Sequence, residues 1–208
     1  MFIAFEGGDG AGKSTQVAAL AEHLRAGGFE VVTTREPGGT PLGARIREML
    51  LHADEVSPRA EALLFAADRA HHVDTLIRPA LARGAIVLTD RYVDSSLAYQ
   101  GAGRALAVDD VAHLSTWATS GLVPDLTVLL DIDSTEGRTR RSGRTEDRME
   151  TEAAAFHDRV RAHFRALAAA EPDRYLVLDA TLPVEELSEQ IRARVSALLP
   201  ASQGGRSA

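Results

Sequence analysis

Gly7-Gly8-Asp9-Gly10-Ala11-Gly12-Lys13-Ser14 is the stretch that organises the rest of this chain. It matches the phosphate-binding pattern G-x-x-x-x-G-K-[ST]. The apolar run at residues 1–5 before it predicts a strand, and residues 15–25 after it place Val17 and Leu20 on one face of a helix. A strand, a glycine loop and a helix in this order let backbone N–H groups surround a phosphate at the helix N-terminus. The stretch therefore predicts an α/β fold with a phosphate site.

Lys13 is the only lysine in the chain, and apart from the histidines every other basic residue is an arginine. A compact ammonium is thus kept at the one position where it must fit among phosphates in place of a planar guanidinium. In loops of this kind the lysine neutralises the outer phosphates, and the next hydroxyl, here Ser14, is a ligand of Mg²⁺. The loop therefore predicts a nucleotide site with Mg²⁺ as cofactor.

Length and composition are those of a globular protein. The chain has 208 residues, 45% hydrophobic and 25% charged, and we expect one domain over residues 1–200 followed by a disordered tail at 201–208. Because there is no cysteine, disulfides and thiolate metal sites are excluded. No apolar run has membrane-spanning length and the chain starts with a strand rather than a signal peptide, so we expect a cytoplasmic protein. The net charge of −7 argues against binding to long nucleic acids, whereas a mononucleotide needs only a local arginine cluster.

Apolar strand patterns alternate with helical patterns along the chain, which is typical of crossover units in a parallel sheet. Further strands are predicted at residues 30–34, 85–89, 126–131 and 174–179. Amphipathic helices are predicted at residues 42–51, 58–81, 151–170 and 184–199, with another after Asp109. We therefore expect a parallel sheet of about five strands flanked by helices, with ligands bound at the carboxyl ends of the strands.

Charged residues follow two of these strands. Arg35 and Glu36 come after the second strand, and Asp90 and Arg91 after the third. At this edge of the sheet Asp90 would hold Mg²⁺ or its water shell, and Arg91 would bind an anion. The alternatives stay open: an ordinary turn with two solvated charges at Arg35 and Glu36, and a surface ion pair at Asp90 and Arg91.

Phe65 and Arg69 are four residues apart in a predicted helix and therefore share a face. In one interpretation, the Phe65 ring stacks on a nucleobase and the Arg69 guanidinium forms hydrogen bonds beside it. In the other, Phe65 is a core aromatic and Arg69 a surface arginine, and spacing alone favours this second interpretation. Adjacent residues on a helix point apart, so we expect His71 and His72 to be solvated rather than to bind a metal. Trp117, the single tryptophan, is expected in the core.

Five arginines gather in the span from Arg138 to Arg148. They repel one another unless an anion is near, and the rest of the chain is acidic. We interpret this span, roughly residues 137–150, as an arginine-rich lid that closes on phosphates. The alternative is a solvated face balanced by acidic neighbours such as Glu146 and Glu150.

In order and spacing, short segments distributed over the chain resemble bacterial thymidylate kinases, and the resemblance extends over the whole chain except its last residues. The segments are residues 6–15, 35–40, 65–69, 90–92 with 99–101, 124–127 and 147–150. The resemblance implies a three-layer nucleoside monophosphate kinase fold and Mg²⁺-dependent transfer of the ATP γ-phosphate to dTMP, which gives dTDP and ADP. Because the acceptor phosphate is already ionised at neutral pH, this chemistry needs positioning and charge neutralisation rather than a dedicated general base.

The resemblance also implies roles for individual residues. ATP would be bound by Gly7, Gly8, Asp9, Gly10, Ala11, Gly12, Lys13, Ser14 and Thr15. The acceptor dTMP would be bound by Asp9, Arg35, Glu36, Phe65, Arg69, Arg91, Ser96, Tyr99 and Gln100. Mg²⁺ would be held by Ser14, Asp90 and Glu36, where Glu36 and Asp90 either join the metal shell or order a phosphate. The catalytic residues would be Lys13, Asp9, Arg91, Arg140 and Arg144.

Within the acceptor set, the resemblance implies that Asp9 meets the sugar 3′-hydroxyl and that Tyr99 crowds the 2′ position, which favours deoxyribose. Phe65 would stack on thymine while Arg69 hydrogen-bonds its edge. The family also suggests a homodimer, for which the predicted helices near residues 42–51, 63–81 and 108–117 could supply the face.

Two other kinds of function compete with this interpretation. Another small phosphate-loop kinase, acting on a deoxynucleoside or a different monophosphate, would share the ATP site. A nucleotide-dependent switch or partitioning ATPase is a different class, but guanine-specific switches carry an Asn-Lys-x-Asp motif and this chain has no asparagine. A binding-only role would leave the lid arginines without a function.

Gly10 stands where one type of the family carries an arginine, so this chain resembles the type whose catalytic arginine lies in the lid, at Arg140, Arg141 or Arg144. We expect Arg144→Ala to lower kcat far more than the affinity for dTMP, because the arginine would stabilise charge that develops on the transferred phosphoryl group. Steady-state kinetics with varied dTMP measures both quantities, and a variant with normal turnover contradicts the assignment.

Overall fold

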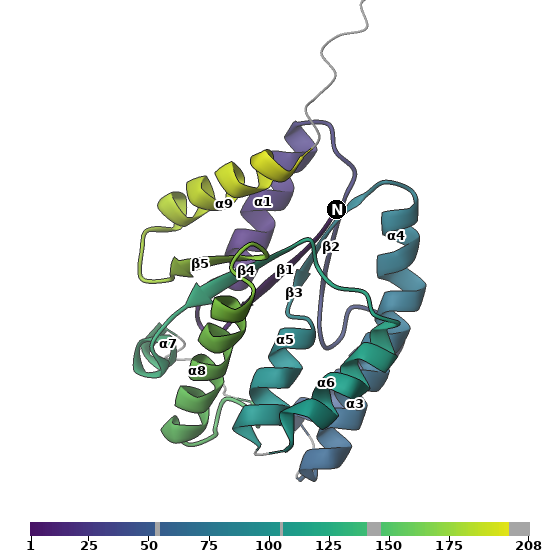
Figure 1. The fold of residues 1–208 in the computed structure, drawn as a ribbon, viewed down its shortest axis with the longest axis vertical. Coiled ribbons are helices and arrows are strands. Elements are labelled where there is room, and N and C mark those ends of the chain that lie inside the picture. The colour runs from purple at the N-terminus through teal and green to yellow at the C-terminus, as the bar shows by residue number, and fades with distance from the viewer. Residues whose placement is uncertain (53–54, 105, 141–146, 200–208) are drawn as a thin grey trace, which may run out of the picture.

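The computed structural model describes residues 1–52, 55–104, 106–140 and 147–199. At its centre is a sheet of parallel strands in the order β2-β3-β1-β4-β5, with helices on both faces (Figure 1). The strands are β1 (Phe2–Gly7), β2 (Val31–Arg35), β3 (Ile86–Asp90), β4 (Leu126–Asp131) and β5 (Tyr175–Asp179). The predicted α/β fold, with a parallel sheet of five strands between helices, is confirmed.

Helices connect each strand to the next, and a further helix follows the last strand. They are α1 (Lys13–Ala26), α2 (Pro41–His52), α3 (Pro58–His72), α4 (Arg78–Ala82), α5 (Val93–Ser96), α6 (Val108–Thr119), α7 (Ser134–Arg140), α8 (Ala154–Ala170) and α9 (Val184–Leu198). Two π-helical segments, η1 (Val73–Ile77) and η2 (Leu97–Gly103), continue α3 and α5. The predicted helix over residues 58–81 is therefore three consecutive helical segments. Within the described ranges, no helix combines the length and apolar character that crossing a membrane requires.

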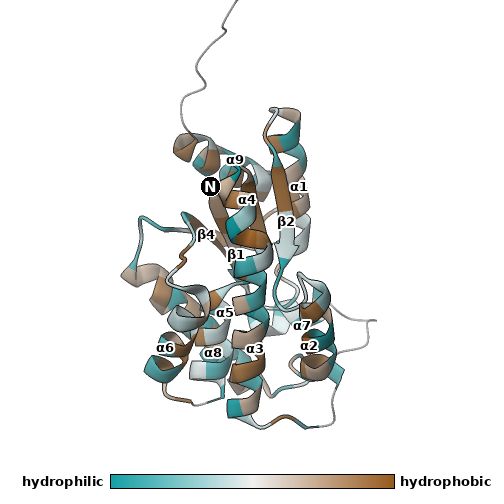
Figure 2. Ribbon diagram, turned by 90° about the vertical axis from the view of Figure 1, so that its right-hand side faces the viewer, coloured by the Kyte–Doolittle hydropathy of each residue, from teal (hydrophilic) through white to brown (hydrophobic). Residues whose placement is uncertain are grey.

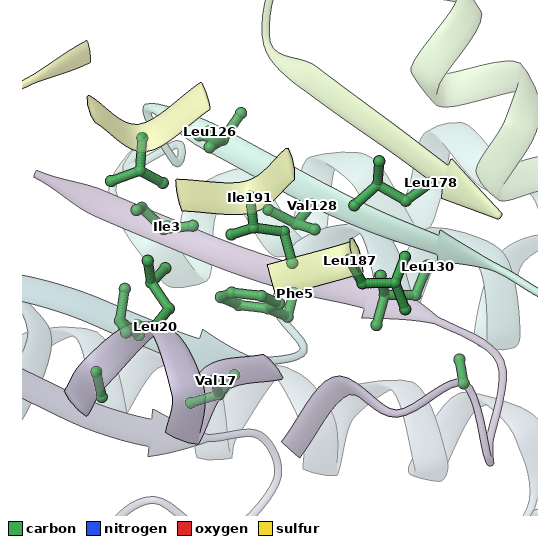
Figure 3. Packing of buried hydrophobic residues seen from close by; sticks show 14 of the residues in the cluster. Ile3, Phe5, Val17, Leu20, Leu126, Val128, Leu130, Leu178, Leu187 and Ile191 are labelled. Carbon is green, nitrogen blue, oxygen red and sulfur yellow. The ribbon is translucent and has the colours of Figure 1, made fainter. Parts of the chain in front are cut away.

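The core lies on both faces of the sheet, because successive strand residues point to opposite sides. Ile3 and Phe5 of β1 pack against Leu20 of α1 and Ile191 of α9 on one face (Figure 3). Phe2 points to the other face, beneath η1 and α4. In Figure 2 the central strands β1 and β4 are accordingly coloured as apolar. Burial of these side chains is the main term that stabilises the fold.

The sheet order brings the predicted functional segments together. In the sheet, β2 and β3 lie on one side of β1, whereas β4 and β5 lie on its other side. The strand order therefore reverses direction at the carboxyl end of β1. Crevices at the carboxyl ends of strands next to such a point are where open α/β sheets bind ligands. The register sets Arg35 beside Asp90, which joins the two charged strand ends that the sequence singled out.

Two predictions about ring side chains are wrong. Trp117 is 80% exposed, because α6 turns Val111 and Ala118 inward and this indole outward. His72 is fully buried. Its two ring nitrogens lie 2.9 Å from Glu36 Oε1 and 2.6 Å from Thr34 Oγ1, and these hydrogen bonds compensate for the lost contact with water. Helical spacing separates the faces of a helix but does not say which face meets the core.

Candidate active site

The phosphate loop joins β1 to α1, and two of its glycines are required by their surroundings. Gly7 has φ of 132°, and a Cβ there would lie 2.3 Å from the carbonyl oxygen of Leu130. Gly10 has φ of 83°, and a Cβ there would lie 2.4 Å from the carbonyl oxygen of Gly137. Backbone atoms exclude a side chain at both positions. Gly10 thus lets the loop pack closely against α7, where the predicted lid begins.

Lys13 is buried beneath this loop. Its Nζ donates to the carbonyl oxygens of Gly7 at 3.0 Å and Gly8 at 2.8 Å. Burial, followed by the neighbouring charge of Arg91, lowers the pKa of Lys13. A bound phosphate would counter both effects, because an opposite charge at short range favours the ammonium form.

Ser14 and Asp90 meet beside the loop. Ser14 Oγ donates to Asp90 Oδ2 at 2.7 Å, which joins the first turn of α1 to the end of β3. A hydroxyl and a carboxylate next to phosphates are typical of nucleotide-bound Mg²⁺, which completes its shell with phosphate oxygens and water. No three His, Asp or Glu side chains form a metal cluster within the ranges that the structure covers. The residues present therefore fit a Mg²⁺ that the nucleotide itself helps to hold.

Arg91 connects the loop to the segment that follows β3. Its φ of 72° is a left-handed conformation that residues other than glycine rarely adopt. Its guanidinium donates to Asp9 Oδ1 at 2.5 Å, and to the Gly7 carbonyl and Ser95 Oγ, each at 3.1 Å. Although burial disfavours its charge, Tyr99 and Asp9 hold the pKa of Arg91 above its usual value. Arg91 is therefore a cation held in one position.

Glu6 supports this turn from within β1. It is fully buried, and its carboxyl group accepts from the backbone N–H of Tyr92 at 2.8 Å and from Ser95 Oγ at 2.6 Å. Burial, followed by the charge of Asp94, raises the pKa of Glu6 to about 7. The turn that presents Arg91 is thus anchored by a carboxyl group whose role the sequence did not indicate.

Two adjoining cavities meet at Asp9 and Arg91. One, which we call the phosphate cleft, is lined by residues of the phosphate loop and by Thr15, Arg35, Asp90 and Arg140. The other, which we call the Phe65 pocket, is lined also by Phe65, Arg69, Ser96, Tyr99 and Gln100. Both cavities are lined by Asp9, Glu36, Arg47, Leu51, Arg91 and Asp147. Every residue that the resemblance assigned to dTMP therefore lines one of the two cavities.

Arg69 forms the inner wall of the Phe65 pocket and is fully buried. Its guanidinium donates to Glu36 Oε2 at 2.7 Å, and to Ser96 Oγ and the Tyr92 carbonyl, each at 3.0 Å. The other oxygen of Glu36 lies 2.9 Å from His72 Nδ1. The surface position that spacing favoured for Arg69 is wrong, because a buried carboxylate and two further acceptors compensate for the loss of hydration.

Tyr99 and Gln100 reach the Phe65 pocket from η2. The Tyr99 hydroxyl donates to Asp9 Oδ2 at 3.2 Å and accepts from Arg91 Nη2 at 3.2 Å. Gln100 Nε2 donates to Glu61 Oε1 at 2.9 Å. π-Helical turns occur often at functional sites, where the extra residue redirects side chains. Residues 101–103 form the end of this π-helical segment.

The predicted lid lies partly within the described residues. Arg140 ends α7 and lines the phosphate cleft, and its Nη1 donates to the Ala180 carbonyl at 2.8 Å. Arg148, which also belongs to the predicted lid, lies in a turn and donates to Glu61 Oε2 at 2.5 Å, so it binds a buried carboxylate. Two predicted lid arginines, Arg141 and Arg144, lie outside the described residues.

Sequence reasoning missed Arg47, which lines both cavities. It is half-buried on α2, and its Nη1 donates to the Pro37 carbonyl at 3.0 Å. Burial, followed by the charge of Arg35, lowers the pKa of Arg47. Neighbouring cations of this kind attract an anion. Helical spacing gave no signal for Arg47, because only the packing of α2 decides which of its faces meets the cavities.

Comparisons with known proteins agree with this geometry. A family model described as thymidylate kinase matches residues 5–191. The chain is 59% identical to the thymidylate kinase of Clavibacter sepedonicus over 204 residues, which is 97% of each chain. It is 61% identical to that of Leifsonia xyli over 198 residues, which is 94% of each. Among solved structures, it resembles the thymidylate kinase of Ehrlichia chaffeensis with a TM-score of 0.77 and 33% identity, over 96% of this chain and 98% of that one.

Asp68, beside the Glu36 loop, generates a prediction about pH. It is fully buried, and its Oδ1 accepts from the backbone N–H of Gly38 at 3.3 Å. Its Oδ2 has no hydrogen-bond partner among the described residues. Burial, followed by the charge of Glu36, raises the pKa of Asp68 to about 6. The folded state therefore binds a proton on the Asp68 carboxyl group more tightly than the unfolded chain does. As a result, the free energy of unfolding falls as the pH rises from about 4 through about 6.

Replacing Asp68→Asn removes this ionisation and keeps an acceptor for Gly38. We expect the free energy of unfolding of the variant minus that of the natural chain to increase by on the order of 1 kcal/mol from pH 5 to pH 8. Urea unfolding at both pH values measures the gain. Asp74→Asn, which changes an exposed carboxylate on η1, is the control and should show no such gain. A difference between Asp68→Asn and the natural chain that stays constant with pH contradicts the prediction.

Proposed function

Because the chain belongs to the thymidylate kinase family, we propose that ATP binds in its phosphate cleft and dTMP in its Phe65 pocket. The chain phosphorylates dTMP to dTDP, with ATP as the phosphoryl donor. The observation that carries the assignment of the sites is the junction of the two cavities at Asp9 and Arg91. A donor phosphate in one cavity and an acceptor phosphate in the other would meet there.

We assign the donor phosphates to the phosphate loop and the N-terminus of α1. Backbone N–H groups at a helix N-terminus bind anions, and the lysine ammonium has three N–H groups to share between loop carbonyls and phosphate oxygens. The loop residues in this assignment are Gly7, Gly8, Asp9, Gly10, Ala11, Gly12, Lys13, Ser14 and Thr15. Burial of Lys13 supports the assignment, because a desolvated ammonium gains most from a nearby anion.

Mg²⁺ would be held by Ser14 and Asp90 together with the nucleotide. When bound, the ion neutralises negative charge on the phosphates. Glu36 was predicted either to join this metal shell or to order the acceptor phosphate. Its contacts with Arg69 and His72 engage both carboxylate oxygens, which supports the ordering role.

The acceptor phosphate would bind among Arg91, Arg35 and Arg47. These cations line the phosphate cleft, and Arg91 and Arg47 line the Phe65 pocket as well. A phosphate oxygen that is already ionised is itself the nucleophile, so the protein has to align the reactants and neutralise charge. We assign the remaining charge neutralisation to Arg140, which lines the phosphate cleft, and to Arg144.

The nucleoside would lie between Phe65 and the η2 segment. The half-buried Phe65 ring lines the pocket and can stack on thymine, with Ser96 and Gln100 beside it. Arg69 has five N–H groups, and among the described contacts two of these remain for the edge of the base. We assign Asp9 to the sugar 3′-hydroxyl and Tyr99 to the 2′ side, where its bulk disfavours ribose.

We also propose that residues 1–200 form a single kinase domain with a lid at about residues 137–150, and that the protein works in the cytoplasm. The tail at residues 201–208, predicted to be disordered, lies outside the described residues. The continuous sheet, whose strands span residues 2–179, supports the single domain.

An acceptor panel tests the assignment of the Phe65 pocket. With ATP and Mg²⁺, we expect kcat/KM to be highest for dTMP among dTMP, dUMP, thymidine, CMP and AMP. Loss of the thymine methyl in dUMP should lower kcat/KM by about 10-fold or more. Thymidine should react least well, because it lacks the phosphate that the three arginines would bind. A higher kcat/KM for thymidine, CMP or AMP than for dTMP contradicts the assignment.

We propose a homodimer formed through α2, α3 and α6. These helices lie next to one another (Figure 2), since α3 contacts both of the others. They expose large apolar side chains, namely Met49 on α2, Leu63 on α3 and Trp117 on α6. Such a gathering is typical of a protein interface, in which aromatic anchors supply much of the binding energy.

Trp117→Glu tests this interface. We expect the natural chain to sediment as a dimer at micromolar concentration, and the variant as a monomer, because a buried carboxylate without a partner opposes association. Val177→Glu is the control, since Val177 is 49% exposed on the edge strand β5 and away from the three helices. Sedimentation velocity measures the masses. A monomeric natural chain, or equal behaviour of both variants, contradicts the proposal.

A further inference from the structure

Glu61 is a fully buried carboxylate on α3 on which several donors converge. Oε1 accepts from Gln100 Nε2 at 2.9 Å and from Arg104 Nε at 3.2 Å. Oε2 accepts from Arg104 Nη2 at 3.1 Å and from Arg148 Nη2 at 2.5 Å. Burial opposes the ionised form, but the hydrogen bonds from Arg104, Gln100 and Arg148 lower the pKa of Glu61. Glu61 is therefore a fixed anion that only accepts hydrogen bonds.

The donors come from two separate parts of the Phe65 pocket wall. Gln100 lines the pocket from η2, and Arg148 is flanked by Asp147 and Met149, which line it from the opposite segment. Arg148 also donates from Nε to the Leu50 carbonyl at 3.0 Å. The carboxylate of Glu61 thus joins the η2 wall, the 147–149 wall and the end of α2.

The chemistry of a carboxylate also orients its partners. Because an ionised carboxylate has no N–H or O–H to donate, it binds the amide end of Gln100 and directs the carbonyl oxygen of that side chain elsewhere. It also holds Arg148, whose sequence neighbours Asp147 and Met149 line the pocket. Glu61 does not itself line the pocket, so any effect on the acceptor passes through these neighbours.

We propose that Glu61 is a positioning residue that sets the affinity for dTMP by holding Gln100 and Arg148, and with them the two walls of the nucleoside pocket, at a fixed separation. This inference rests on the proposed binding of dTMP in the Phe65 pocket. The side chains assigned to the donor phosphates and Mg²⁺ are outside this network: among the described residues, Lys13, Ser14 and Asp90 hydrogen-bond to none of Glu61, Gln100 and Arg148. Loss of the Glu61 charge therefore acts on dTMP and leaves ATP unaffected.

Glu61→Gln is the central variant, because it keeps the shape of the side chain and removes the charge. We expect the Kd for dTMP, measured by calorimetry without ATP, and the KM for dTMP to rise about 10-fold or more, since hydrogen bonds to charged groups contribute that much to an equilibrium. The KM for ATP should stay within about twofold of the natural value. Glu152→Gln is the matched control: among the described contacts, Glu152 pairs with Arg104 and with neither Gln100 nor Arg148, so this variant should leave both constants for dTMP unchanged.

Arg148→Gln supplies a second variant in case Glu61→Gln folds poorly, because the Arg148 side chain is 17% exposed whereas that of Glu61 is fully buried. It should raise the Kd for dTMP as well, and the double variant should raise it by less than the product of the two single effects. A fall in melting temperature with unchanged Kd and KM for dTMP in both single variants overturns the proposal. Failure of the natural chain to bind or phosphorylate dTMP would instead overturn the assignment of the pocket.

Discussion

The ion pair between Arg91 and Asp9 is the contact on which the arrangement of the site depends. It joins the end of β3 to the phosphate loop, and it stands where the phosphate cleft meets the Phe65 pocket. The left-handed backbone of Arg91 costs energy, and a strained residue persists only where its surroundings over-determine it. Here the surroundings are the Gly7 carbonyl, the Tyr99 hydroxyl and the turn that Glu6 anchors from below.

Two buried carboxylates on either side of the Phe65 pocket extend this arrangement. Glu36 binds Arg69 and His72, and Glu61 binds Arg104 and Arg148. Buried ion pairs add little net stability, because the loss of hydration offsets the attraction between the charges. Their effect is geometric: each carboxylate holds side chains from several segments in one arrangement, and removing either charge would take an ionic partner from each of these side chains.

Much of the site could be predicted from local patterns. The phosphate loop was identified by its motif, and Arg35, Asp90 and Arg91 by their positions after apolar strands, since parallel strands end at a common edge. The Phe65–Arg69 pair was found by its spacing, but the spacing favoured a surface arginine where the structure buries one. His72 and Trp117 were misplaced for a related reason, because periodicity groups residues by face without saying what each face meets. Glu6, Arg47 and Glu61 left almost no local signal, since each acts through contacts with distant segments.

The sequence by itself determined the alternation of strands and helices, the phosphate loop and the polar strand ends, because these depend on patterns within a few residues. Only the tertiary structure decided which charges pair. Asp9 and Arg91 are 82 positions apart, and Glu61 and Arg148 are 87 apart. No local propensity links residues at such separations. The packing of the helices on the sheet brings them together, and burial then selects the few pairs in which every charge finds a partner.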